Sequence, residues 1–523
     1  MHQRIDALIE KHAAQKQAKL APAADDAEFV RRIYLDLTGR IPTIDETRAF
    51  LADDSKDKRT KLIDRLLGSA EYPRRMAELF HIMLMERRGD HAEWDKFLRH
   101  AFAQNQSWDD IATAILKPDA DDESHRGAAF FMTSRLVSEG AMAEVDVPGL
   151  TRDVGRLLAG VDLQCAQCHD HLDVEDYKQR DFQGLHMVFE NVQSRRDTGF
   201  PAISEKLMTK EQEYMSVFVQ SPETTSPVVP GGQTIPIVTY EGDEAYSVLP
   251  DKKAKQPGEP KFSPLAELAK GLTAKDNELF AANMVNRMWH AMMGRGLIEP
   301  LDLIHADNPP SHPELLKLLT SEFTAHDYDL KWLMRELALT KVYGRTSHIG
   351  DGETVPDTDT FAVAIERRIS AEQLFRNVLV ATGELNRHEI SWDAPPEEFD
   401  TFIADNEELK KLQELFVKTF ANPPKEPELE FAPTVKSALF LMHEERVLKL
   451  LQPRDGNLTD RLATIEDDNA LIDELFLAIL SRPPTDEDIA DVAKFLSDSE
   501  DRAQAIHQVA WALLASTEFC VNH

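Results

Sequence analysis

The sequence predicts a mainly α, multi-helical fold with a small β-containing insert between two helical halves. Apolar residues recur at helical spacing through most of the chain, and capping patterns open several of these stretches. Residues 195–262 differ, because Val, Ile, Thr and Tyr cluster there between Pro and Gly, as in short strands and turns. We therefore expect a helical part over 1–194, a β/loop insert or linker over 195–262, and a helical part over 263–523.

The clearest amphipathic helix is predicted over residues 139–162. Its apolar face is formed by Val147, Leu150, Val154, Leu157, Leu158 and Val161. This helix leads directly into Cys165. A second helix is predicted around "NRMWHAMM" and should end at Gly294 and Gly296.

Capping boxes are predicted at three places, where a Ser or Thr is followed three residues later by an acidic residue. They are Thr43 with Glu46, Ser311 with Glu314, and Thr485 with Asp488. The first and last belong to an internal echo: "IYLDLTGRIPTIDE" (33–46) aligns with "LFLAILSRPPTDED" (475–488), and "LLGSAEY" (66–72) with "LLASTEF" (513–519). A weaker third copy runs from Ser311 to residue 343. We interpret these as recurring capped helical hairpins that serve as scaffold; the alternative is chance similarity between capped helices.

The composition limits the classes of partner. The chain has 523 residues and a formal net charge of −33, from 92 acidic and 59 basic residues. Such a surface repels nucleic acid and anionic lipid. It either favours basic partners or is a solvated surface that has no partner. No apolar run reaches the roughly 18 residues of a transmembrane helix, so no membrane span is expected. Three cysteines are too few for a disulfide framework.

Two of these cysteines form the motif Cys165-x-x-Cys168-His169, and His171 follows it. Covalent haem c needs two thiols for the two vinyl groups and a histidine immediately afterwards for the iron. We expect haem c to be attached to Cys165 and Cys168, with His169 as the proximal iron ligand. His171 is expected to contact the cofactor, through a hydrogen bond to a propionate or by lining an access channel.

The sixth iron ligand is not fixed by the motif. His186 and Met187 lie in the next predicted helix, and we select Met187 as the distal candidate. Further options are Met83, Met85, Met132 and Met142.

Two other interpretations of the motif stay open. A non-haem metal, zinc or iron, could use Cys165, Cys168 and His171, although no second cluster completes a structural zinc site. Redox or structural thiols are the other alternative, although a thioredoxin-like dithiol needs a βαβ context. No P-loop, dinucleotide-binding glycine pattern, Gly-x-Ser-x-Gly or His-Glu-x-x-His motif is present, so whether the protein is an enzyme is open.

Several stretches resemble a known family. "FVRRIYLDLTGRIPTIDETRAFL", "LLAGVDLQCAQCHDH" and "DYKQRDFQGLHMVFEN" resemble the planctomycete cytochrome-C-related domain, which carries a Cys-x-x-Cys-His-Asp-His core. Three further stretches resemble the domain that usually follows this one in the family. They are "NMVNRMWHAMMGRGLIEP", "RRISAEQLFRNVLVATG" and the C-terminal copy of the internal echo, residues 475–488 and 513–519. Both are domains of unknown function. The resemblance implies export and neighbourhood with sulfatase-like proteins or polysaccharide-degradation genes. The sequence departs from the family after His171, where "LDVEDY" follows.

Haem c is attached outside the cytoplasmic membrane, so we expect a periplasmic or otherwise extracytoplasmic protein whose signal peptide is absent from this sequence. The expected function is electron transfer or haem-based redox with a basic redox partner protein, in a system linked to polysaccharide degradation. One alternative is an enzyme that uses a non-haem metal held by the Cys/His cluster. The other is a binding or scaffold protein.

Overall fold

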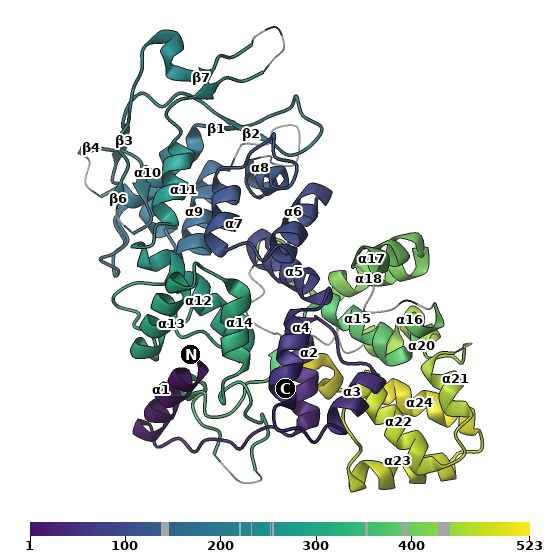
Figure 1. The fold of residues 1–523 in the computed structure, drawn as a ribbon. Helices are drawn as coiled ribbons and strands as arrows, with labels where there is room; N and C mark the ends of the chain where they lie inside the picture. Colours follow the sequence, from purple (N-terminus) through teal and green to yellow (C-terminus); the bar gives the residue numbers. More distant parts are fainter. Residues whose placement is uncertain are drawn as a thin grey trace. The chain divides into compact units, whose positions relative to one another are not determined.

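The computed structural model describes residues 1–136, 146–218, 221–231, 233–251, 253, 256–350, 354–388, 390, 396–426, 440–454 and 456–523. As predicted, the fold is mainly α (Figure 1). The chain forms two compact units. The discontinuous unit contains Met1–Met76 and Arg335–His523, and the central unit contains Ala77–Met334. Helices α5 (Glu71–Met85) and α14 (Leu330–Ala338) contain the boundaries between them.

These units divide the chain at different places from the ranges predicted from composition. The chain passes from one unit to the other after residues 76 and 334, whereas its amino-acid composition changes at residues 194 and 262. Composition marks where the chain becomes irregular, and contacts mark which segments pack together, so the two divisions describe different properties.

The discontinuous unit is helical on both sides of its interruption. Its elements are α1 (His2–Gln15), α2 (Asp26–Leu37), α3 (Ile44–Leu51), α4 (Lys58–Leu67), β9 (Arg367–Arg368), α15 (Ala371–Thr382), α16 (Glu384–Arg387), α17 (Pro396–Asp405), α18 (Glu407–Phe420), α20 (Glu445–Leu450), α21 (Leu458–Ala463), α22 (Asp468–Leu480), α23 (Asp486–Asp498), α24 (Arg502–Leu514), α25 (Thr517–Cys520) and β10 (Val521–Asn522).

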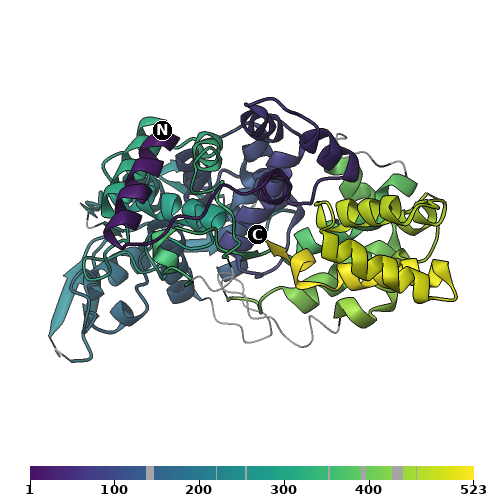
Figure 2. The same cartoon turned by 90° about the horizontal axis from the view of Figure 1, so that it is seen from below.

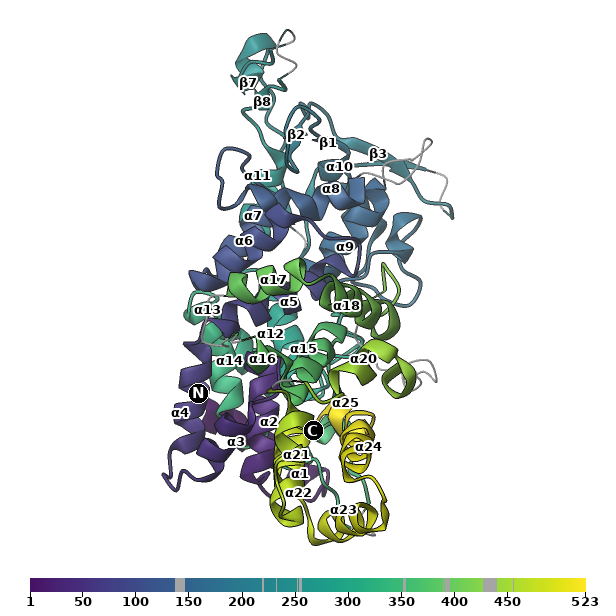
Figure 3. The ribbon, with the colours of Figure 1, turned by 90° about the vertical axis from the view of Figure 1, so that its right-hand side faces the viewer.

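The core of this unit joins segments that are far apart in the sequence. Leu35 of α2 belongs to the same buried cluster as Phe375 of α15, Phe416 of α18 and Leu475 of α22. Helices α22, α23 and α24 pack side by side, and they are the yellow helices in Figures 2 and 3. Burial of these apolar side chains is the main force that holds the unit together.

A buried polar cluster fixes the C-terminal strand of the unit. Asp36 accepts hydrogen bonds from Asn522 Nδ2 (2.9 Å), Tyr343 Oη (2.7 Å) and Arg367 Nη2 (2.7 Å). Arg32 Nε donates to the His523 carbonyl (3.0 Å). Burial, and then the neighbouring Asp36 charge, raise the pKa of Tyr343 well above its usual value. These contacts give Asn522 and His523 a structural role.

The central unit combines helices with short antiparallel strand pairs. Its helices are α6 (Ala92–Ala103), α7 (Trp108–Leu116), α8 (Phe130–Leu136), α9 (Val147–Ala159), α10 (Gln179–Glu190), α11 (Pro264–Leu272), α12 (Glu278–Met293) and α13 (Pro313–Ala325). Within the described residues, no helix combines the length and apolar composition of a membrane span.

In the described part of the central unit, the strands lie between residues 192 and 260 and form two-stranded sheets. The pairs are β1 (Val192–Ser194) with β2 (Ile203–Glu205), β3 (Gln212–Met215) with β4 (Pro222–Thr225), β5 (Val228–Val229) with β6 (Gln233–Thr234), and β7 (Tyr246–Val248) with β8 (Glu259–Pro260). Figure 3 shows β7 and β8 in a projecting loop and β3 beside α10.

The predicted capping boxes have different outcomes. Those of Thr43 with Glu46 and Thr485 with Asp488 are confirmed. The one at Ser311 is wrong: the N-cap of α13 is His312, and no side chain makes a capping hydrogen bond there. The reason is that α13 begins at Pro313, one residue later than this pattern requires, so Ser311 lies before the N-cap. The Leu297 carbonyl holds Ser311 there, since it accepts from both its amide (2.7 Å) and its hydroxyl (3.2 Å).

Both predicted helices are present, and the beginning of the first lies outside the described residues. Helix α9 (Val147–Ala159) confirms the middle of the 139–162 prediction, and residues 139–145 lie outside the described residues. The predicted end is wrong by three residues, because Gly160 takes a left-handed φ of 71° and Val161 forms a β-bridge with Leu303. Helix α12 ends at Gly294, which has a left-handed φ of 82° as expected for a C-terminal glycine.

Candidate functional site

The Cys-x-x-Cys-His motif lies in a turn that directly follows α9. Gly160 ends that helix with a left-handed φ of 71°. A side chain at this position would collide with Ile304, whose amide donates to the Gly160 carbonyl (2.9 Å). The Asp162 carboxylate accepts from the Gln164 amide (2.9 Å), and the 3₁₀ turn Cys165–Gln167 follows.

Both motif cysteines are exposed and unpaired. The Cys168 carbonyl accepts a hydrogen bond from the Val217 amide (3.1 Å), which joins the motif to the segment just after β3. The two thiols are therefore accessible on the surface of the central unit, and the backbone of their turn is anchored.

His169 is held in one tautomer. Its Nδ1 lies 2.6 Å from the Asp170 carbonyl oxygen, which can only accept, so Nδ1 carries the proton. This assignment leaves the lone pair on Nε2. A histidine with its Nδ1–H on a backbone carbonyl has the arrangement of metal-ligating histidines that bind through Nε2. The ring of Phe218 lies against His169, with ring centroids 4.7 Å apart.

His171 has the opposite tautomer and caps its own loop. Its Nδ1 accepts from the amides of Asp173 (3.1 Å) and Val174 (3.0 Å), so its proton is on Nε2. Its backbone amide donates to the Tyr177 carbonyl (2.9 Å). The structure thus gives His171 a local role that the sequence did not reveal, and leaves one N–H to donate.

Glutamines of α10 fix the motif against its neighbours. The Gln179 amide donates to Asp170 Oδ1 (2.9 Å), and its side chain donates to the Met215 carbonyl (3.3 Å). One helical turn later, Gln183 Nε2 donates to the Gln167 carbonyl (3.0 Å). The motif turn, α10 and the end of β3 therefore form one connected structure.

Met187, the predicted distal ligand, is placed away from this surface. It is 3% exposed and lines a cavity of about 1080 Å³ between α10 and residues 192–212. No residue of the 165–171 stretch lines that cavity. His186 stacks on Phe182, and burial lowers its pKa. Met85 and Met132 are fully buried, Met83 is half-buried, and Met142 lies outside the described residues.

The surface beside the motif is unusually apolar. Leu172, in the loop after His171, is 73% exposed, and Met215, Val217 and Phe218 are 55%, 61% and 65% exposed. We refer to these four residues as the apolar patch. Clustered apolar side chains on a surface typically mark a binding site. The patch was not predicted from the sequence, although the apolar residues in "YMSVF" (214–218) are a pattern that indicates one.

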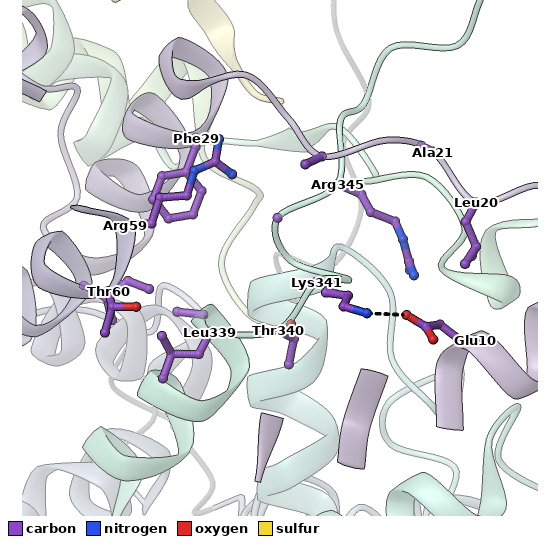
Figure 4. A pocket seen from close by; sticks show the side chains of 14 residues that line it. Glu10, Leu20, Ala21, Phe29, Arg59, Thr60, Leu339, Thr340, Lys341 and Arg345 are labelled. Atoms are coloured by element: carbon purple, nitrogen blue, oxygen red, sulfur yellow. Dashed lines mark hydrogen bonds and ion pairs between the residues drawn. The ribbon is translucent and has the colours of Figure 1, made fainter. Parts of the chain in front are cut away.

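A separate cavity of about 380 Å³ lies within the discontinuous unit (Figure 4). Its charged side chains are engaged internally: Lys341 pairs with Glu10 (3.0 Å), Arg59 with Asp26 (2.8 Å), and Arg345 donates to the Phe361 carbonyl (2.7 Å). Across the described ranges, no group of three or more His, Cys, Asp or Glu residues has a geometry that could hold a metal ion.

Comparison with known proteins identifies two segments. Residues 4–194 match the family model PSCyt2, described as a protein of unknown function (DUF1549). Residues 266–496 match PSD1, described as a protein of unknown function (DUF1553). The two occur in the order that the resemblance implies. No curated protein and no solved structure matches the chain.

Proposed function

We propose that this chain is an exported c-type haem protein that acts in electron transfer or haem-based redox. The observation that carries the proposal is the surface turn with two unpaired, exposed thiols followed by a histidine whose Nε2 keeps its lone pair. Cys165 and Cys168 would form the thioethers and His169 would bind the iron. The residues fit the group, since a porphyrin also needs apolar contacts and the apolar patch borders the motif.

The bound haem would supply one-electron redox chemistry, and the chain's own residues set its surroundings. The Asp170 carbonyl orients His169 and makes it a better ligand through the 2.6 Å hydrogen bond. Covering an apolar side chain such as Leu, Val or Phe completely contributes about 1.5–3 kcal/mol. The patch would thus stabilise attachment and exclude water, and the Nε2–H of His171 would be available to a propionate.

The surroundings of the protein form part of the proposal. Haem c attachment implies a periplasmic or extracytoplasmic location. The net charge of −33 favours a redox partner with a basic surface. The link to polysaccharide degradation depends only on the family resemblance.

The non-haem metal alternative is less well supported by the geometry. It relies on His171 as a third ligand for zinc or iron. In the observed loop His171 Nδ1 already accepts two backbone hydrogen bonds, so the neutral ring has no second lone pair. Metal binding would require this loop to open. The scaffold or binding-protein alternative is not favoured by a specific contact.

We also propose that the echoed stretches are copies of one capped helical hairpin with a structural role. The copies at residues 33–46 and 475–488 each have a Thr capping box and an arginine that bonds both the capping acid and a glutamate in a later helix. The weaker third copy lacks the capping box. The strands between residues 192 and 260 would form an insert between the two helical parts.

The proposal is tested by producing the full chain with an export signal in a host that matures cytochromes c. We expect haem that survives acid-acetone extraction and gives a pyridine haemochrome with two thioethers. Cys165→Ser and Cys168→Ser together should abolish it. Cys520→Ser is the matched control, because Cys520 is the remaining cysteine, and burial raises its pKa to about 11. Absence of covalent haem, while another c-type cytochrome matures normally in the same cells, would overturn the proposal.

A further inference from the structure

We propose that the cavity of about 1080 Å³ in the central unit binds an amphipathic organic anion, a molecule with an apolar body and one carboxylate or sulfonate group. The cavity is separate from the Cys-x-x-Cys-His motif, since no residue of the 165–171 stretch lines it. The inference therefore does not require haem attachment, and it adds a binding function to the redox function proposed above.

The walls of the cavity come mainly from the end of α10 and from the β1–β2 hairpin. The hairpin and the chain that follows it contribute residues 191–196, 201–202 and 206–212. Strand pairing fixes the hairpin, and β1 lies beside α8 (Figure 3). Sites for small molecules usually measure about 300–1,000 Å³, so this cavity is large enough for a complete organic ligand.

The floor of the cavity is apolar. It includes Met187, Val192, Ala202 and Met208, which are between 2% and 5% exposed. An apolar group placed on this floor leaves water, which is favourable. Methionine side chains are flexible and polarisable, so the floor can adapt to apolar bodies of different shape. Met187, the candidate iron ligand from the sequence, is thus part of a surface suited to an apolar molecule.

The mouth of the cavity is cationic. Arg196, Lys206 and Lys210 line the cavity and are exposed, and their side chains make no ion pair or hydrogen bond within the described residues. Arg195 also lines the cavity, and it pairs with Asp197 (2.7 Å). Charges of one sign around a concave opening raise the local concentration of oppositely charged molecules.

Acidic side chains do not cancel this charge. Two carboxylates line the cavity, against four basic side chains. Glu211 accepts a hydrogen bond from Ser226 (3.0 Å), and Glu190 lies 3.8 Å from His186 Nδ1. The chain as a whole has a formal charge of −33, so a surface with an excess of positive charge is a local exception. This exception is expected where an anion binds.

Ser194 adds a polar group that needs a partner. It lines the cavity just before Arg195 and Arg196, and its buried hydroxyl makes no hydrogen bond within the described residues. A buried hydroxyl without a partner is unfavourable, so a ligand that supplies an acceptor removes a cost. Carboxylate and sulfonate oxygens only accept hydrogen bonds, so such a group suits both this hydroxyl and the cationic side chains.

The two zones together define the chemical class of the ligand. An inorganic anion would use the mouth and leave the floor uncovered, whereas a neutral apolar molecule would use the floor alone. A molecule with an apolar body and an anionic end uses both. Fatty carboxylates and aromatic sulfonates share this chemistry, and the test includes one of each.

The test is isothermal titration calorimetry of the full chain with dodecanoate, kept below its micelle concentration, and with naphthalenesulfonate. We expect saturable one-to-one binding of at least one of them, and the tighter of the two identifies an acyl or an aromatic ligand. Dodecyltrimethylammonium keeps the acyl-type body and reverses the charge, while hexanoate keeps the charge and shortens the body. Each should bind at least about tenfold more weakly than dodecanoate if the ligand is acyl.

Charge reversal at the mouth provides the variant. Lys206→Glu with Lys210→Glu should weaken binding of the anion by at least about tenfold, because two attractive charges become repulsive. The matched control is Lys410→Glu with Lys494→Glu, since both lysines are exposed and belong to the discontinuous unit. It changes the net charge by the same amount and should keep the affinity.

Three results would overturn the proposal. The first is the absence of saturable binding of either anion. The second is equal weakening by both lysine pairs, which would show a general effect of net charge. The third is inorganic sulfate binding as tightly as the organic anions, which would show that the floor contributes nothing. Haem attachment is measured separately by the pyridine haemochrome, so failure of one proposal leaves the other standing.

Discussion

Two arginines in the discontinuous unit make the same set of contacts in different solvent environments. Arg40 Nε and Nη2 donate to Glu71 (both 2.8 Å), and its Nη1 donates to Glu46 (2.7 Å). Glu46 is also the acidic member of the Thr43 capping box. One buried guanidinium thus joins a helix start to the beginning of α5.

Arg482 repeats this arrangement near the C-terminus. Its Nε donates to Glu518 (2.6 Å) and its Nη1 to Asp488 (2.8 Å), the acidic member of the Thr485 capping box. The preceding residues match as well, since Gly39 and Ser481 both have left-handed φ values, 78° and 60°. The same local sequence pattern therefore gives the same bonds twice.

The two clusters differ in burial. The Arg40 side chain is 1% exposed, whereas that of Arg482 is 26% exposed. A buried charge that loses its partner is very costly, while a charge near water is partly compensated by solvation. Arg40 Nη2 makes one further bond, to Glu46 (3.0 Å), and the other bonds correspond. The comparison teaches that a shared hydrogen-bond pattern does not imply an equal contribution to stability.

The largest effect is expected from Arg40→Ala. It removes the two 2.8 Å bonds to the buried Glu71, which keeps a longer contact from Arg74 (3.3 Å), and breaking a buried pair costs about 3–5 kcal/mol. Arg482→Ala is the matched control and should cost about 1 kcal/mol or less, as for exposed pairs. Urea-unfolding midpoints of the two variants give the comparison. Equal losses would mean that burial does not distinguish the clusters.

Glu46, the acidic residue of the Thr43 capping box, gives the next prediction. Burial alone would raise the pKa of Glu46, but the charge and hydrogen bonds of Arg40 outweigh it and lower the pKa to about 2. A carboxylate whose pKa is lower in the folded state stabilises the fold at any pH above its unfolded-state pKa, which is about 4.3 for Glu. This stabilisation is lost as the pH falls through the folded-state pKa. The loss should therefore extend from about pH 4.3 down to about 2.

Glu46→Gln tests this window. The variant should lose about 2 kcal/mol at neutral pH, as for a hydrogen bond between charged groups. Its stability should fall less steeply with acid between pH 4.3 and 2, measured as thermal midpoints across that range. A variant that keeps the unsubstituted protein's acid slope would show that other carboxylates account for the acid sensitivity.

The sequence predicted contacts correctly where they are local. The Thr43 and Thr485 caps involve residues three positions apart, so the sequence alone identifies them. Haem attachment at the five-residue Cys-x-x-Cys-His motif stays a prediction. Ser311 has the same spacing and fails, because contacts with Leu297 hold it outside the helix, which begins one residue later than the spacing requires. Spacing alone does not show at which residue a helix begins.

The rest of the site depended on contacts between separate segments. Met215, a member of the apolar patch, is 50 positions from Cys165 in sequence, and its segment reaches the motif through the Val217–Cys168 and Gln179–Met215 hydrogen bonds and the Phe218–His169 ring contact. Met187 lies in the next predicted helix, but its side chain is 3% exposed in α10. Exposure is set by packing, which one sequence does not display.

The smallest predicted effect comes from Ser481→Gly, which gives the Arg482 cluster the same left-handed glycine that precedes Arg40. Ser481 is fully buried with φ 60°, and its hydroxyl has no hydrogen-bond partner within the described residues. Ser481→Gly removes a left-handed strain of about 1–2 kcal/mol. It also makes the unfolded chain more flexible, which costs about 0.4–1 kcal/mol. The net expectation is a stabilisation of about 0.5–1 kcal/mol, detectable as a higher urea midpoint.

The reverse change at the matched position is the control. A Cβ at Gly39 would lie 2.9 Å from Arg376 Nη2 and 3.0 Å from Arg75 Cδ, so Gly39→Ser should destabilise the unit through both strain and crowding. Opposite signs for the two substitutions would show that the left-handed position prefers glycine in both clusters. Destabilisation by Ser481→Gly would instead mean that the serine side chain contributes packing that outweighs its strain, and that the two clusters differ in more than burial.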